Sequence, residues 1–155
     1  MNDQVTTFTV PPVVKTVTVR CPQDRAFRIF TADFGRWWPL QTHHLAPDPE
    51  ACVFEGWKSG RVFERGADGG EGLWGRVEAW EPPRRLAFTW VVGSAKDAAQ
   101  RVEVTFTPVG SGTRVELVHT GWEKLGDRAA AARDSYDKGW VTVFEQGYAA
   151  YANAN

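Results

Sequence analysis

The sequence predicts an α+β protein in which about seven antiparallel strands form a curved sheet against one long carboxy-terminal helix. Between residues 51 and 120, short apolar segments alternate with tight turns, and no helical period intervenes. Between residues 136 and 151, aromatic residues recur every three or four positions, which is the period of a buried helix face. Because a half-buried sheet needs a cover and this helix is the only sizeable partner, the two should pack together.

The first element is a strand over residues 13–20, VVKTVTVR, where valines and threonines alternate. Pro22 then suits the first turn of a helix. An apolar stripe follows at helical spacing, with a break expected near Gly35, and it consists of Phe27, Phe30, Phe34 and then Trp37 or Trp38. Neighbouring helix positions point about 100° apart, so one tryptophan should pack inward and the other should lie at the edge, before Pro39 ends the helix.

Six more strands follow, and turns join them. Their sequences are CVFEGW, RVFERG, LWGRVEAW, RLAFTWVV, RVEVTFT and TRVELVHT. Asp68-Gly69 and Gly110-Ser111-Gly112 accept the positive backbone angles of hairpin turns, and a polar stretch that ends in KDAAQ separates the fourth and fifth segments. Consecutive strands without helices predict an antiparallel meander. The alanine-rich residues 126–134 form either the first turns of the last helix or a short helix of their own.

Composition limits the class of protein. The length of 155 residues suits one domain, which we place at 13–152 after a tail at 1–12. Eighteen basic and nineteen acidic residues are scattered along the chain, so nothing indicates a nucleic-acid or membrane partner. No apolar run approaches a membrane span, and the amino end lacks a secretory signal, so we expect a cytoplasmic protein. Eight tryptophans and nine phenylalanines require a packed core, an aromatic-lined cavity or both.

Three stretches resemble one family in order along the chain. They are TVTVRCPQDRAFRIFTADFGRWWP, SGRVFERGADGGEGLWGRVEAWEPPRRLAFTW, and VELVHTGWEKLGD followed by YDKGW. On these residues the chain resembles the activator-of-Hsp90-ATPase-like family, within the START and Bet v 1-like superfamily, also called SRPBCC. The resemblance implies the helix-grip fold, with two short helices after the first strand and a cavity between the sheet and the long helix.

The resemblance implies several functions. Relatives in the superfamily carry lipids and hormones, cyclise polyketides, or act as chaperone partners. We expect a binding module for a small hydrophobic, aromatic molecule, with a cyclase, dehydratase or hydrolase as the alternative. A second alternative is a protein-interaction module of the co-chaperone kind. Because the eukaryotic activator carries a further amino-terminal domain, and we expect none before residue 13, only weak chaperone docking is implied. Monomer and homodimer both stay open.

Strand parity identifies side chains that face a cavity. Trp90 shares a face with Leu86, Phe88 and Val92, so it should point inward. His119 shares the inward face of its strand with Val115 and Leu117, and Gly121 and Trp122 follow. Such a histidine is either an acid or base for catalysis or a buried side chain satisfied by a hydrogen bond.

Other candidates stay ambiguous at this level. If Trp74 and Arg76 face the cavity, they offer a ring and a cation to an anionic aromatic ligand; otherwise they face solvent, and Trp57 shares this ambiguity. On the last helix, an aromatic stripe is core and one wall of the pocket at once. The complete set of expected ligand-binding residues is Trp37, Trp38, His43, Trp57, Trp74, Arg76, Trp90, His119, Trp122, Tyr136, Trp140 and Phe144.

Metal and cofactor chemistry have little support in the sequence. His43 and His44 are neighbours in an expected loop, where adjacent side chains diverge, so we expect them at the pocket rim rather than on a metal. Cys21 and Cys52 fit no metal-ligand spacing and no disulfide framework. No nucleophile motif or phosphate-binding loop is present. We therefore expect no cofactor, no metal and no evident set of catalytic residues.

Overall fold

The computed structural model describes residues 10–92 and 99–155, and in this part of the chain seven strands form one antiparallel sheet. The strands are β1 (Val13–Val19), β2 (Pro49–Phe54), β3 (Arg61–Gly66), β4 (Glu71–Glu81), β5 (Arg85–Trp90), β6 (Gln100–Val109) and β7 (Gly112–Thr120). Their order is β1-β7-β6-β5-β4-β3-β2, so the predicted meander is confirmed. Residues 1–9 of the expected tail, and most of the expected connection that ends in KDAAQ, lie outside the described residues.

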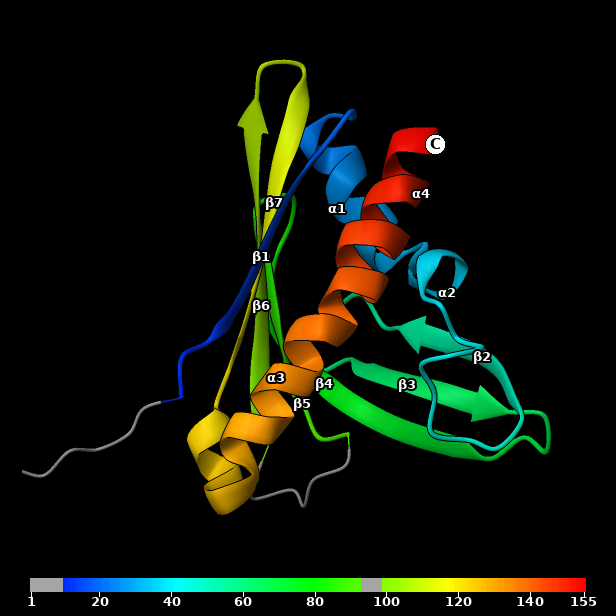
Figure 1. The fold of residues 1–155 in the computed structure, drawn as a ribbon. Helices are drawn as coiled ribbons and strands as arrows, with labels where there is room; N and C mark the ends of the chain where they lie inside the picture. The colour runs from blue at the N-terminus through cyan, green and yellow to red at the C-terminus, as the bar shows by residue number, and fades with distance from the viewer. Residues whose placement is uncertain (1–9, 93–98) are drawn as a thin grey trace, which may run out of the picture.

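The sheet bends along β4, which belongs to both of its halves. The first part of β4 pairs with β3 and the second part pairs with β5, and the register shifts once in each part. Such shifts bend a strand and increase its twist. Gly75 lies at the first shift, where a Cβ atom would stand 1.7 Å from the carbonyl oxygen of Thr89, so only glycine fits. In Figure 1, β1, β6 and β7 stand upright, whereas β2 and β3 lie to their right and run nearly horizontally.

One long helix crosses the concave side of this sheet (Figure 1). It begins as α3 (Ala129–Trp140), continues as a π-helical segment η3 (Val141–Tyr148), and ends as α4 (Ala149–Ala154). A 3-10 segment, η2 (Trp122–Arg128), precedes it, and Gly126 within this segment forms a kink with a positive φ of 59°. The alanine run is therefore the first turn of the long helix. Within the described residues, no helix has the length and hydropathy that a membrane span requires.

Two short helices after β1 close one end of the fold, as predicted. They are α1 (Gln23–Thr31) and α2 (Phe34–Trp37), so the break falls between Thr31 and Phe34 and not near Gly35. The Thr31 hydroxyl donates back to the carbonyl of Phe27 at 3.0 Å, an arrangement that bends helices. The hydroxyl of Tyr148 on the long helix donates to the carbonyl of Ala26 at 2.8 Å. The short helices are thus fixed to the carboxy-terminal half of the long one.

Candidate functional site

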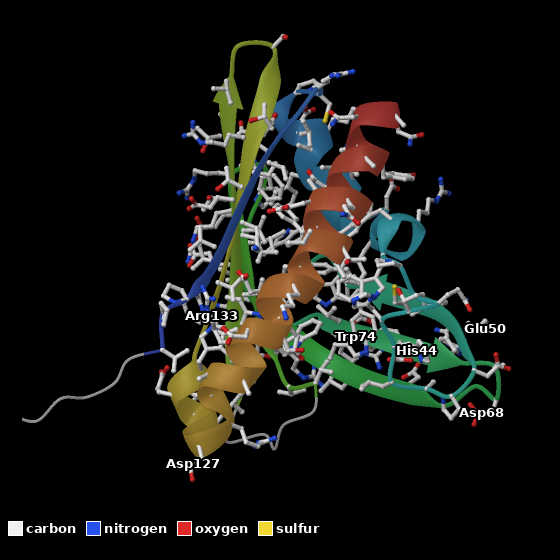
Figure 2. The ribbon with its side chains drawn as sticks, viewed as in Figure 1. His44, Glu50, Asp68, Trp74, Asp127 and Arg133 are labelled. Carbon is white, nitrogen blue, oxygen red and sulfur yellow. The ribbon has the colours of Figure 1, made fainter. Side chains whose placement is uncertain are left out.

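An apolar cavity of about 210 Å³ lies between the long helix, the first part of β4, the last residue of β5, and the segment after α2. Four tryptophans, one tyrosine and two histidines dominate its walls. The lining residues are Trp38, Thr42, His43, His44, Leu45, Trp74, Trp90, Val92, Tyr136, Gly139, Trp140 and Val143. In Figure 2, His44 and Trp74, which both line this cavity, lie on the side of the long helix where β3 and β4 run.

The four tryptophans of the cavity, here called the tryptophan box, contact one another. Trp38 lies with its ring centroid 4.8 Å from that of Trp74 and 6.2 Å from that of Trp90. Trp140 completes the box, 6.0 Å from both Trp38 and Trp90. Aromatic rings at these separations attract one another through their edges and faces. The four rings come from three separate parts of the fold, so the box exists only in the folded protein.

Every indole N–H of the tryptophan box donates to an acceptor in the protein. The Nε1 atom of Trp38 donates to the carbonyl of His43 at 2.9 Å. The remaining three donate to side chains: Trp74 to Glu64 at 2.8 Å, Trp90 to the Tyr136 hydroxyl at 2.9 Å, and Trp140 to His119 Nδ1 at 3.0 Å. Since an indole has only this one donor, the box presents apolar ring surface to the cavity.

His119 is fully buried behind the box and both of its ring nitrogens are paired. Nδ1 accepts from Trp140, so the neutral ring carries its proton on Nε2, which donates to Gln100 Oε1 at 3.0 Å. Burial lowers the pKa of His119 from 6.5 to about 3. Of the two interpretations of the sequence, this arrangement matches the buried, hydrogen-bonded histidine. A general base needs an available lone pair, and His119 offers none to the cavity.

Three further aromatic candidates lie in the core and do not line the cavity. Trp37 is buried and donates from Nε1 to the carbonyl of Ile29 at 2.9 Å. Trp122 lies against His119 with centroids 4.2 Å apart, and Phe144 stacks on Tyr148 at 5.5 Å. Both Trp37 and Trp38 are buried, so the expectation that one would lie at the edge is wrong; Trp38 is the one that lines the cavity.

Trp57 and Arg76 also lie away from the cavity, which corrects the expectation that they bind a ligand there. Trp57 is 57% exposed in the turn between β2 and β3. Arg76 is exposed and donates from Nη1 to the carbonyl of Ser59 at 3.2 Å. Strict alternation would place Trp74 and Arg76 on one face, but the register shift at Trp74 adds one residue and turns them to opposite faces.

The two adjacent histidines sit at the cavity rim with their Nδ1 atoms bound to their own segment. The Thr42 hydroxyl lies 3.2 Å from the carbonyl oxygen of Pro39 and 2.8 Å from His43 Nδ1, and its single proton can be donated to either. His44 Nδ1 donates to the carbonyl of Ala46 at 2.5 Å. In the neutral ring of His44, Nε2 therefore carries the lone pair. Desolvation by burial, and then the charge of His44, lower the pKa of His43.

Glu64 is a residue of the candidate site that the sequence did not single out. Its carboxylate is only 1% exposed and accepts hydrogen bonds from Trp74 Nε1 and from the backbone N–H groups of Leu45 and Ala46. Glu64 thereby joins β3 to residues 42–46, here called the histidine segment, and to the tryptophan box. The alternation of the strand could have indicated its burial. Glu64 lies two positions after the inward-facing Val62 and therefore on the same face, whereas Arg61 lies on the other face.

Within the described residues, the geometry provides no candidate for a metal site or for a reactive thiol. Among residues 10–92 and 99–155, no group of three histidine, cysteine or acidic side chains could hold a metal ion. Cys21 and Cys52 are both free thiols in the core. Burial, with a smaller contribution from Glu64, raises the pKa of Cys52 to about 12, so this thiol stays protonated at neutral pH.

The fold and the cavity together define a helix-grip protein with a small aromatic pocket between its sheet and its long helix. This chain belongs to the family described as activator of Hsp90 ATPase homolog 1-like protein, which matches residues 20–150. The family membership and the fold expected from the sequence are thereby confirmed. A comparison with curated proteins found no match.

Solved structures of similar chains include one whose name states an activity. Txn09, an anthrahydroquino-gamma-pyrone synthase complexed with a ligand abbreviated SUM, is 38% identical, with 83% of this chain and 88% of that chain covered and a TM-score of 0.58. MLL2253 from Mesorhizobium loti is 21% identical over 88% and 93% of the two chains, with a TM-score of 0.65. BH1534 from Bacillus halodurans is 20% identical over 86% and 91%, with a TM-score of 0.61. The last two similarities show the fold alone.

Proposed function

We propose that this protein binds a small planar aromatic molecule in the cavity between the sheet and the long helix. The tryptophan box carries the proposal. Buried side chains normally pack to the density of organic crystals, yet an apolar space of about 210 Å³, partly open to solvent, remains among four large rings. Because each indole N–H already has an acceptor in the protein, the remaining surface is suited to stacking and edge contacts with another ring.

Gly139 allows the cavity to be filled without disturbing its walls. This residue lines the cavity, and a Cβ atom there would meet nothing within 4 Å. Gly139→Leu should therefore occupy the ligand's space while favouring the helix. Lys138→Leu, at the exposed neighbouring position, adds the same side chain outside the cavity and serves as the control.

The assay is binding of fluorene, a rigid planar hydrocarbon, followed by quenching of tryptophan fluorescence and by calorimetry. We expect Gly139→Leu to weaken fluorene binding at least tenfold and Lys138→Leu to leave it unchanged. Equal affinity for fluorene in the wild type and a folded Gly139→Leu variant would place the binding elsewhere and refute the proposal. So would the failure of fluorene and of oxygenated tricyclic relatives to bind the wild type at all.

A second candidate is a ring-closing enzyme, favoured by the 38% identity with a gamma-pyrone synthase. A fused gamma-pyrone forms when a phenol oxygen adds to a side-chain ketone and water leaves. The cavity offers a lone pair on the Nε2 atom of His44, which can accept the phenol proton, and the Tyr136 hydroxyl, which can donate to the ketone oxygen. His119 has no part in this version, since both of its nitrogens are paired.

A simple substrate tests this second candidate. Conversion of o-hydroxybenzoylacetone to 2-methylchromone and water is followed by ultraviolet absorbance at neutral pH. Catalysis predicts a rate above the uncatalysed one that falls in Tyr136→Phe, whereas a pure binding module leaves the uncatalysed rate unchanged. The co-chaperone alternative stays a prediction, and it requires a complex with a purified Hsp90-type protein at high micromolar concentration.

A further inference from the structure

The cavity has few polar side chains among the described residues, and the partners of these side chains determine most of their hydrogen-bond roles. All four indole N–H groups donate within the protein, as described above. Tyr136 and the rim residues Thr42, His43 and His44 supply the other polar side chains of the lining. Thr42 is itself occupied, since its hydroxyl lies within hydrogen-bond distance of both the Pro39 carbonyl and His43 Nδ1. A ligand in this cavity is therefore recognised mainly by Tyr136 and by the two histidines.

Tyr136 can donate a hydrogen bond to a ligand. Its oxygen accepts the N–H of Trp90 at 2.9 Å, and this contact holds the ring at the cavity wall. The hydroxyl proton has no acceptor among the described residues, so it is available to an oxygen on the ligand. Desolvation by burial raises the pKa of Tyr136, so the phenol is neutral at physiological pH.

The histidine segment offers a hydrogen-bond acceptor to a ligand, whereas Tyr136 offers a donor. Because its Nδ1 donates to the carbonyl of Ala46, the neutral His44 ring offers an Nε2 lone pair, which accepts hydrogen bonds, and the neighbouring His43 offers one in the tautomer whose Nδ1 donates to Thr42. Among residues 10–92 and 99–155, the lining contains no lysine or arginine, and the lowered pKa of His43 favours its uncharged ring at neutral pH. A carboxylate on the ligand would therefore lose its hydration without gaining a cation.

We propose, on the basis of the binding function above, that the cavity selects a neutral hydroxylated aryl ketone or quinone, with the ligand carbonyl accepting from Tyr136 and a ligand hydroxyl donating to His43 or His44. Tyr136 is the residue that determines specificity for the carbonyl. The walls of the tryptophan box bind any flat ring of suitable size, whereas these three side chains form hydrogen bonds with the oxygen atoms on the edge of that ring. Arg76, which would have favoured an anionic ligand, lies on the outer face of the sheet.

Four tricyclic probes of nearly equal shape test the proposal. They are fluorene, 9-fluorenone, 2-hydroxy-9-fluorenone and 9-fluorenone-2-carboxylate, and calorimetry measures their affinities. One neutral hydrogen bond is worth a factor of roughly three to ten. We expect fluorenone to bind roughly three to ten times more tightly than fluorene, the hydroxyketone to bind at least as tightly as fluorenone, and the carboxylate to bind more weakly than the hydroxyketone.

Variants then assign the effect to residues. Tyr136→Phe should abolish the preference for fluorenone over fluorene and leave fluorene itself bound, which also shows that the variant is folded. His44→Phe should reduce the gain from the ligand hydroxyl and spare the ketone preference. The proposal is overturned if wild-type protein binds fluorene and fluorenone equally, if the carboxylate binds most tightly, or if Tyr136→Phe keeps the ketone preference. In each of these cases fluorene still binds, so the failure is distinct from failure of the proposed function.

Discussion

Acidification should destabilise this protein through His119, and the size of the effect follows from its burial. The pKa of His119 is about 3 in the folded protein against an ordinary value of 6.5. Between these values the unfolded chain binds a proton that the folded protein does not, so stability is complete above pH 6.5 and is lost as pH falls toward 3. The loss amounts to about 2 kcal/mol at pH 5 and roughly 5 kcal/mol once the pH is below 3. Physically, a proton on Nδ1 would face the N–H of Trp140.

Urea denaturation at pH 7 and pH 5, followed by tryptophan fluorescence, measures this loss. Other groups, including His43, titrate in the same interval, so the wild type is compared with His119→Gln, in which they are retained. The variant should be less stable at pH 7, because the contact with Trp140 is disturbed, but it should lose about 2 kcal/mol less than the wild type between the two pH values. If wild type and variant lose the same free energy of unfolding, His119 is not buried in its neutral form and the reasoning is wrong.

Three further outcomes are expected. Glu64→Gln should lower the free energy of unfolding by about 2 to 4 kcal/mol in urea denaturation, because the amide turns an N–H toward buried donors, whereas the exposed control Glu50→Gln should change it by less than about 0.5 kcal/mol. Gly75→Ala should either prevent folding or lower the melting temperature sharply, since its Cβ would overlap the backbone of β5; an unchanged melting temperature would contradict the bend in β4. Trp57→Ala should leave fluorene affinity unchanged within error, because Trp57 lies in an exposed turn; a clear loss in calorimetry would mean that the binding site is elsewhere.

The sequence predicted the fold well because the relevant signals are local. Period-two alternation identified the strands, and helical spacing identified the long helix and the short ones. Strand parity also placed Trp90 and His119 correctly on the inward face, since β5 and β7 keep a regular register. In β4 the same rule fails, because the register shifts at Trp74 and at Glu78 each insert one residue. Alternation along one strand contains no information on how its partner strands are offset.

The chemistry of the site was less predictable because it depends on contacts between distant residues. Trp90 meets its acceptor Tyr136 across 46 positions, and Trp140 meets His119 across 21. Neither pair has a spacing that a sequence pattern detects. Glu64 shows the same limit, since a charged residue in a strand is ordinarily taken as solvent-facing. Its burial becomes intelligible only when the histidine segment supplies two backbone N–H groups to its carboxylate.

These hydrogen bonds explain how an apolar cavity stays open in so small a protein. A ring held only by apolar contacts can rotate about its side-chain bonds and fill a neighbouring void, which recovers lost contact energy. In the tryptophan box, collapse of any ring would break a hydrogen bond and leave a buried N–H unsatisfied, at a cost of about 1 to 3 kcal/mol. The four acceptors, which are the His43 carbonyl, Glu64, Tyr136 and His119, come from different elements. The walls of the cavity are therefore preorganised, because the hydrogen bonds that hold them point away from the open space, and this is what the proposed binding of a flat ligand requires.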